Sequence, residues 1–153
     1  MKGRYLGVDP GEKRIGLAVS DPSGSIARPL RVIEHSARMV DAAQIAALAA
    51  EEDVVGIVVG QAMDDEGQPT PEGRKAARLA EAIRLQTNLP VNLWDESFST
   101  QTARQTRIAM GVTRRKRSGH LDDLAAAVIL QSYLDAGEAG PAHLAEDQKG
   151  EVV

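Results

Sequence analysis

Acidic residues stand at three places where strands or helices are expected to end or begin. Asp9 follows a short apolar run, Asp95 and Glu96 follow another, and Asp122 and Asp123 open an alanine-rich segment. Carboxylates brought together at one sheet edge repel one another unless a cation lies between them. Oxygen ligands without His or Cys suit Mg²⁺ or Mn²⁺. Two such ions about 4 Å apart can activate water and stabilise the leaving oxygen in phosphodiester hydrolysis.

Each acidic position also has an ordinary structural explanation. Asp9 can organise the Asp-Pro-Gly turn that it begins. Acids before a helix or in its first turn interact favourably with the helix dipole. This interaction alone would explain the acids at the other two positions. We favour a shared site because all three positions are expected at one edge of the sheet. Among the histidines, His35 and His143 are expected to face solvent, and His120 could contact phosphate or a metal-bound water.

A basic segment lies between the second and third acidic positions. The chain has a net charge of −4, yet residues 97–121 contain no Asp or Glu. The cations of this segment are Arg104, Arg107, Arg114, Arg115, Lys116 and Arg117. Lys13 and Arg14 could extend the same surface. A charged run is usually solvated surface, but the absence of acids favours contact with a nucleic-acid backbone, and the aromatic content of 3% argues against base stacking.

The hydrophobic pattern changes period along the chain and so predicts the elements that position these residues. Strands are predicted at 5–8, 15–19, 26–33, 54–59 and 91–94. Helices are predicted at 36–52, 70–86, 99–110 and 122–134, with a basic loop at 111–120. This order predicts an α/β fold with a five-stranded mixed sheet, three antiparallel strands first, and helices on its faces. Residues 1–137 are expected to form one domain and residues 138–153 a disordered acidic tail.

Several local features can be checked directly. Pro29 indicates an edge strand or a bulge. Ser36 is predicted to cap the first helix, and the second is expected to start at Thr70 or Glu72. Ala125 to Ala127 are expected to let the last helix approach the sheet closely. The expected apolar stripe of the first helix consists of Val40, Ala43, Ile45, Ala47 and Leu48.

The composition bounds the class of protein. The chain has 153 residues and no Cys, which excludes disulfides, thiolate metal sites and cysteine nucleophiles. No apolar run approaches the roughly 20 residues needed to cross a bilayer. We expect a cytoplasmic protein that is a monomer or a homodimer.

Three blocks of sequence resemble the YqgF (RuvX) family. They are LGVDPGEKRIGLAVSD at 6–21, DESFST at 95–100 and DDLAAAVILQSYL at 122–134. The blocks occur in the same order and at suitable spacing. The chain departs from the family's pattern at Gly60-Gln61-Ala62, where Gly-Leu-Pro is usual, and at Ser97, where Arg is common. The missing Arg removes a cation near the site and so affects substrate contacts more than metal binding.

The resemblance implies an RNase H-like fold with helices on both faces of the sheet and a divalent metal held by acids. The matching acids are Asp9, Glu96 and Asp122, with Asp95 and Asp123 as reserve ligands. It implies an endonuclease that processes the 5′ end of pre-16S rRNA in ribosome biogenesis. Resolution of Holliday junctions in DNA is the alternative, and a non-catalytic nucleic-acid-binding assembly factor is the third hypothesis. A nucleotide-binding ATPase is disfavoured, because actin-like folds need two strand-turn-strand units and this chain has one.

Overall fold

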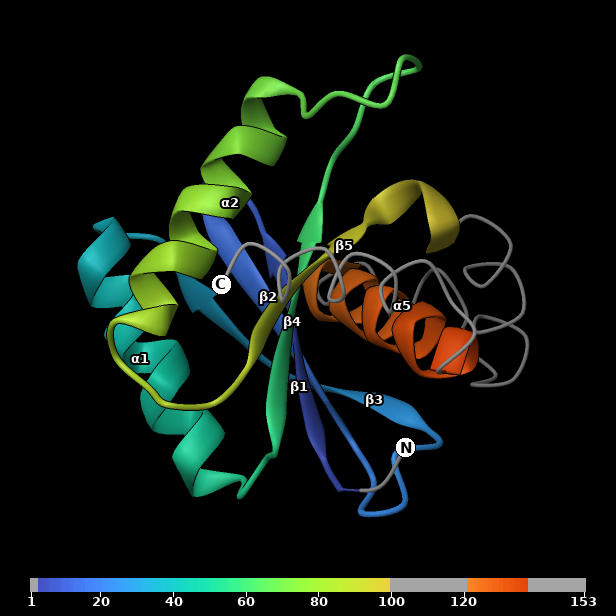
Figure 1. Cartoon of the computed structure of the whole chain (residues 1–153). Coiled ribbons are helices and arrows are strands. Elements are labelled where there is room, and N and C mark those ends of the chain that lie inside the picture. Colours follow the sequence, from blue (N-terminus) through green and yellow to red (C-terminus); the bar gives the residue numbers. More distant parts are fainter. Residues whose placement is uncertain (1–2, 100–120, 138–153) are drawn as a thin grey trace.

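The computed structural model describes residues 3–99 and 121–137 of the chain, and these residues are built around one five-stranded sheet (Figure 1). Its strands are β1 (Tyr5–Pro10), β2 (Arg14–Ser20), β3 (Ala27–Glu34), β4 (Gly56–Gln61) and β5 (Val91–Asp95). Their spatial order is β3-β2-β1-β4-β5. The first three strands form an antiparallel meander, and β4 and β5 continue the sheet parallel to β1. The predicted mixed sheet is confirmed.

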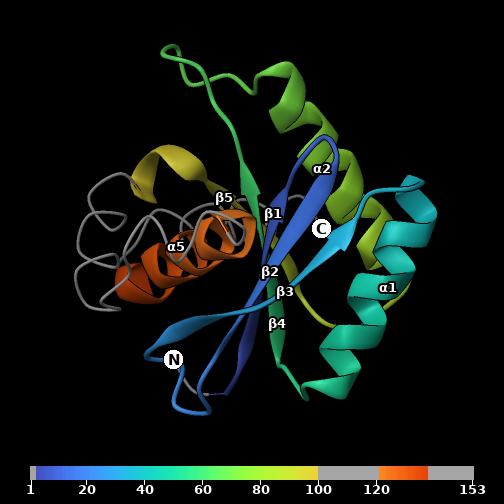
Figure 2. The ribbon, with the colours of Figure 1, turned by 180° about the vertical axis from the view of Figure 1, so that it is seen from behind.

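Helices cover both faces of the sheet, as predicted. The helices α1 (Arg38–Glu51) and α2 (Pro71–Arg84) lie on one face, and α5 (Leu121–Ala136) lies on the other (Figures 1 and 2). A short 3₁₀ helix, η1 (Glu96–Ser99), follows β5 directly and was not predicted. The helix predicted at 99–110 and the basic loop at 111–120 lie outside the described residues, apart from residue 99. No helix in the described ranges is long and apolar enough to cross a membrane.

Side chains alternate between the two faces along each strand, which produces two cores. In β1, Leu6 and Val8 pack into the core shared with α1 and α2. Tyr5 packs instead against the core beneath α5, which includes Trp94 and Leu130. The odd-numbered positions of β1 therefore face α5, and the even-numbered positions face α1 and α2.

Close contact between α5 and the sheet depends on small residues. A Cβ placed on Gly7 would lie 2.7 Å from the Leu130 Cβ and 3.2 Å from the Ala126 carbonyl oxygen, so β1 needs glycine at this position. Ala126 is fully buried, in agreement with the predicted narrow helix. The Trp94 Nε1 donates to the Ser132 Oγ at 3.0 Å, which ties α5 to β5.

Two local predictions are confirmed and two are wrong. The β2–β3 register shifts where Ala18 pairs with Pro29, in an edge strand. Thr70 caps α2 by accepting a hydrogen bond from the Gly73 amide. Ser36 does not cap α1, because Ala37 occupies the N-cap position and the Ser36 amide donates to the Asp41 carboxylate. The stripe of α1 is also shifted: Ile45 and Leu48 are buried, but Val40, Ala43 and Ala47 are exposed and Asp41, Ala42 and Ala49 take their place.

Candidate active site

Asp9 lies near the carboxyl end of β1, on the face covered by α5. It is two residues beyond Gly7, whose missing side chain would point at α5, and strand side chains alternate. Asp9 pairs with Gly16 of β2 and is half-buried. The Asp-Pro-Gly turn predicted from the sequence follows it. Its carboxylate therefore lies at the edge where β1 ends.

Glu96 reaches the same face from β5. Trp94 packs in the core beneath α5, and Glu96 follows two residues later at the start of η1. A Cβ built on Gly60 would lie 3.2 Å from the Glu96 Oε2 and 3.3 Å from its Cγ. The Glu96 side chain therefore lies over Gly60, on the strand between β1 and β5.

Gly60 lies between the two acids in the sheet, and its missing side chain leaves room for Glu96. The paired residues Val8 and Val59 bring β1 and β4 into register, so the next residues along are Asp9 and Gly60. Gly60 also pairs with Trp94 of β5. Because Gly60 has no side chain, the space above it holds the Glu96 carboxylate and the end of the Ile129 side chain.

The start of α5 comes to the same edge. The ring of Tyr5 contacts that of Tyr133 near the carboxyl end of α5, with centroids 5.9 Å apart. Gly7 faces Leu130 and Ala126, which are one to two turns earlier in the helix. The helix therefore runs back along β1, and its first turn, which contains Asp122 and Asp123, approaches the end where Asp9 lies. The side chains of these two acids lie outside the described residues.

Asp95 and Glu96 have different surroundings. Asp95 accepts hydrogen bonds from the amide and the hydroxyl of Ser97, at 2.9 and 2.8 Å, and so stabilises the turn into η1. The pKa of the Glu96 carboxyl is raised, first by burial and then by the negative charge of Asp95. A carboxylate that is costly to hold ionised favours a bound cation beside it. This contrast supports Glu96 over Asp95 as a ligand.

The available donors fit a hard divalent cation. Asp9 and Glu96 offer carboxylate oxygens only, and this is the donor set that Mg²⁺ and Mn²⁺ prefer. Among the side chains that the structure describes, no group of three or more His, Cys, Asp or Glu comes together. The third ligand expected from the sequence, Asp122, is not among those side chains.

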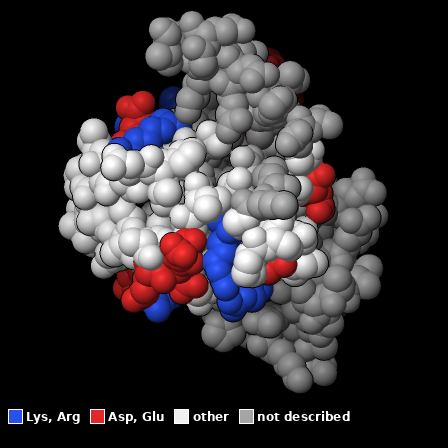
Figure 3. All heavy atoms as spheres, turned by 60° about the horizontal axis from the view of Figure 1, so that its bottom comes forward, with Lys and Arg blue, Asp and Glu red and all other residues white. Residues whose placement is uncertain are grey.

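The basic residues are only partly described. Lys13 lies in the turn that joins β1 to β2, and Arg14 begins β2, so both stand at the edge where β1 ends. Arg104, Arg107, Arg114, Arg115, Lys116 and Arg117 lie outside the described residues. Seen from its lower side, the molecule shows acidic and basic side chains intermingled, with large uncharged areas between them (Figure 3).

The departures from the family's pattern have structural partners. Ser97, in place of the common Arg, donates to Asp95 as described above. The Gln61 Nε2 donates to the Gly73 carbonyl oxygen at 3.1 Å and so holds the first turn of α2 against the end of β4. Both residues that depart from the family's pattern make hydrogen bonds that stabilise nearby turns.

Sequence reasoning missed a pair of ionisable residues on the opposite face of the sheet. His35, expected to face solvent alone, contacts the carboxylate of Asp41 through Nδ1. Asp41 is buried, with 1% of its surface exposed. Its spacing of four from Ile45 and seven from Leu48 is the signal that could have placed it on the buried side of α1.

Sequence comparisons give consistent relatives. The profile of the family "RuvX: Holliday junction resolvase" matches residues 3–136. A protein of Anaeromyxobacter sp. (strain Fw109-5) is 42% identical over 136 residues, which are 89% of this chain and 99% of the relative. One of Desulforamulus reducens is 39% identical over 134 residues, 88% of this chain and 98% of the relative. Both bear the name "Putative pre-16S rRNA nuclease".

Solved structures share the fold. The RuvC of Thermus thermophilus, in complex with a Holliday junction substrate, matches with a TM-score of 0.57 and 21% identity over 88% of this chain and 96% of its own. The Holliday junction resolvase of fowlpox virus, bound to junction DNA, matches with a TM-score of 0.53 and 14% identity over 87% and 97%. These similarities confirm the RNase H-like fold. The match of the family profile over residues 3–136 establishes that this chain belongs to the RuvX family.

Proposed function

We propose that this protein is a metal-dependent endonuclease whose active site is formed by Asp9, Glu96 and Asp122. The observation that carries this proposal is that Glu96 lies over Gly60, in register beside Asp9, on the same face of the sheet and at the edge that the first turn of α5 approaches. An RNase H-like sheet with a nuclease family's sequence supports hydrolysis of phosphodiester bonds.

The three acids would hold one or two Mg²⁺ or Mn²⁺ ions. Such ions lower the pKa of bound water and neutralise charge on the phosphate. The chain's own contribution is to fix the ligands: β1 orients Asp9, the turn into η1 places Glu96 over Gly60, and packing of Ala126 on Gly7 fixes the first turn of α5. Lys13 and Arg14, at the end of β1, are placed to contact neighbouring phosphates.

We propose pre-16S rRNA, cleaved at the 5′ end of the mature sequence, as the substrate. The names of the relatives in Anaeromyxobacter and Desulforamulus support this choice, as does their match over nearly their whole length. This role places the protein in the cytoplasm. A second candidate is resolution of Holliday junctions, favoured by the family's description and by junction-bound neighbours of the same fold.

A substrate comparison tests the proposal. Purified protein is incubated with precursor 16S rRNA fragments and with four-way DNA junctions of matched length, in Mg²⁺, Mn²⁺ or EDTA. We expect cleavage of the RNA that requires the cation and is absent in Asp9→Asn. Preferred cleavage of the junction would identify Holliday junctions, rather than pre-16S rRNA, as the substrate. Binding of both without cleavage by the wild type would indicate the assembly factor.

A further inference from the structure

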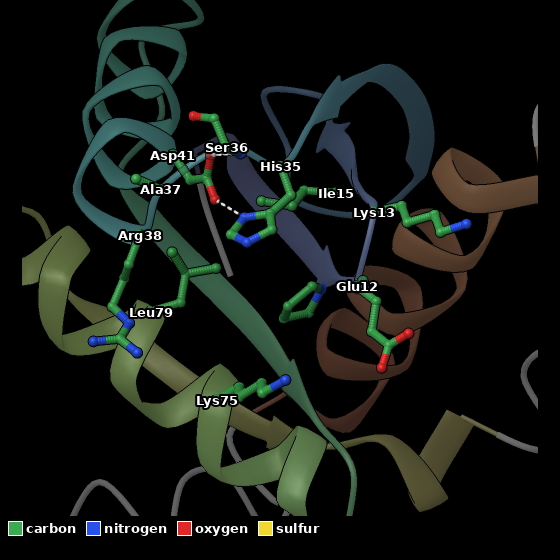
Figure 4. Close-up of a pocket in the computed structure, with 12 residues that line it drawn as sticks. Glu12, Lys13, Ile15, His35, Ser36, Ala37, Arg38, Asp41, Lys75 and Leu79 are labelled. Atoms are coloured by element: carbon green, nitrogen blue, oxygen red, sulfur yellow. Dashed lines mark hydrogen bonds and ion pairs between the residues drawn. The ribbon is translucent and has the colours of Figure 1, made fainter.

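A pocket of about 560 Å³ lies on the face of the sheet opposite the acidic site. It is bounded by the β1–β2 turn, the segment that joins β3 to α1, and residues of α2 (Figure 4). Pockets that hold small organic ligands have volumes of about 300–1,000 Å³. The space is therefore large enough for a nucleotide unit.

His35 is fixed in position at one side of this pocket. Its backbone amide donates to the Lys13 carbonyl oxygen at 2.9 Å, and its Nδ1 contacts Asp41. The other oxygen of Asp41 accepts from the Ser36 amide at 3.1 Å. With Nδ1 engaged, the Nε2 of His35 is directed into the pocket (Figure 4). The His35 side chain is 42% exposed, so a ligand can reach it.

Three cations line the pocket, and the side chain of one of them, Lys13, extends away from the His35 ring (Figure 4). Arg38 extends from the start of α1 toward α2, and Lys75 extends from α2 toward the β1–β2 turn (Figure 4). Neither Arg38 nor Lys75 makes an ion pair with any residue that the structure describes. Their charges are therefore available to an anion that enters the pocket.

The acids of the pocket do not cancel this charge. Asp41 is buried and its oxygens are engaged by His35 and Ser36. Glu12 also lines the pocket, but its side chain extends from the turn away from the His35 ring (Figure 4). Pro10, Ile15 and Leu79 provide apolar walls that suit a sugar or a base.

We propose that this pocket binds one nucleotide unit of the nucleic-acid backbone, with its phosphate against His35, Arg38 and Lys75. The proposal rests on the proposed function for the identity of the ligand. Asp9 faces the acidic site, and the next residue, Pro10, lines the pocket. A strand that passes over the β1–β2 turn can therefore occupy both places, and the pocket would hold the substrate beyond the bond that is cut.

Nuclear magnetic resonance of the histidine rings tests this proposal without metal. The chain has three His, so the His35→Gln variant identifies the signal of His35. The full chain is titrated in EDTA with a single-stranded RNA oligonucleotide, with adenosine monophosphate and with inorganic phosphate. We expect the oligonucleotide to shift the His35 signal.

Affinity measurements on matched variants complete the test. Arg38→Ala/Lys75→Ala should weaken oligonucleotide binding about tenfold, as expected when charge-assisted hydrogen bonds are lost. Arg28→Ala/Arg31→Ala removes the same charge from exposed positions on β3 and should change it little. Equal losses in the two variants, or an unmoved His35 signal, would overturn the proposal. A shift with the mononucleotide or phosphate but not with the oligonucleotide would overturn the backbone assignment. Because no metal is present, these outcomes are independent of whether the wild type cleaves RNA.

Discussion

The absence of a side chain at Gly60 is the residue-scale feature on which the acidic site depends. Asp9 comes from β1 and Glu96 from η1, and the Glu96 carboxylate occupies space that a side chain on Gly60 would fill. The raised pKa of the Glu96 carboxyl shows that burial and Asp95 oppose its ionisation. A cation bound at the proposed site would offset both effects. The geometry of the proposed site therefore depends on Gly60 as well as on its acids.

Replacement of Gly60 with Ala should lower cleavage strongly while the protein stays folded. The new Cβ would meet the Glu96 Oε2 at 3.2 Å and the Ile129 Cδ1 at 2.7 Å, and both are ends of flexible side chains that can move. Displacement of a reacting group by about 1 Å can cost about 100-fold in rate. Single-turnover cleavage and thermal melting on one preparation check this.

Gly7→Ala is the matched comparison on the same face of the sheet. Its Cβ would meet the Leu130 Cβ and the Ala126 backbone rather than a site residue, so its expected effect is a loss of stability of about 1–3 kcal/mol. If Gly60→Ala cleaved at the wild-type rate, Glu96 would not depend on the space above Gly60.

At the scale of elements, the strands and helices could be predicted from the sequence because hydrophobic residues recur with clearly different periods in the two. All five strands and three of the predicted helices are found, and Pro29 and Thr70 act as expected. The predicted start of α1 was wrong: Ala37 takes the N-cap position, and the Asp41 carboxylate, in the first turn of the helix, accepts from the Ser36 amide. Periodicity alone does not show that a buried carboxylate has a histidine partner across the loop.

The β2–β3 hairpin provides a prediction of pH dependence. Asp21 accepts hydrogen bonds from the amides of Ser25 and Ile26 and from the Ser23 hydroxyl. These bonds, with that of Ile26 the largest contribution, lower the pKa of Asp21 from 3.8 to about 2. The ionised carboxylate therefore stabilises the fold above pH 3.8, and this stabilisation is lost as the pH falls to about 2.

Asp21→Asn should accordingly lower the melting temperature at pH 7, and the difference from the wild type should shrink between pH 4 and pH 2, over the range given by these pKa values. Calorimetric melting over this range measures it. A difference that stays constant with pH would show that shape rather than charge matters at this turn.

At the scale of the whole molecule, the acidic site could be predicted only as a set of positions. The sequence indicated that Asp9, Glu96 and the start of the last helix would share one edge, and the described residues bring the first two there. Which of Asp95 and Glu96 faces the site depends on the turn into η1, which has no hydrophobic period of its own. The pocket beside His35 depends on contacts among three distant segments and was not predicted.

The basic segment provides a prediction about how the whole protein binds nucleic acid. Neutralisation of Arg114, Arg115, Lys116 and Arg117 should weaken binding to RNA and DNA alike. Each lost phosphate contact lowers the dependence of log affinity on log salt by about 0.9 on duplex DNA. Binding titrations at several salt concentrations measure this slope. An unchanged slope would assign these residues to solvated surface.

The most direct test of the central claim is single-turnover cleavage by Glu96→Gln, with binding and melting temperature measured on the same preparation. Glutamine keeps the size of the side chain but is a poorer metal ligand. We expect nearly all cleavage to be lost, with nucleic-acid affinity equal or slightly higher because a negative charge near phosphate is removed. Asp95→Asn, the control on the neighbouring carboxylate, should retain cleavage. A stable Glu96→Gln that cuts at the wild-type rate would contradict the claim.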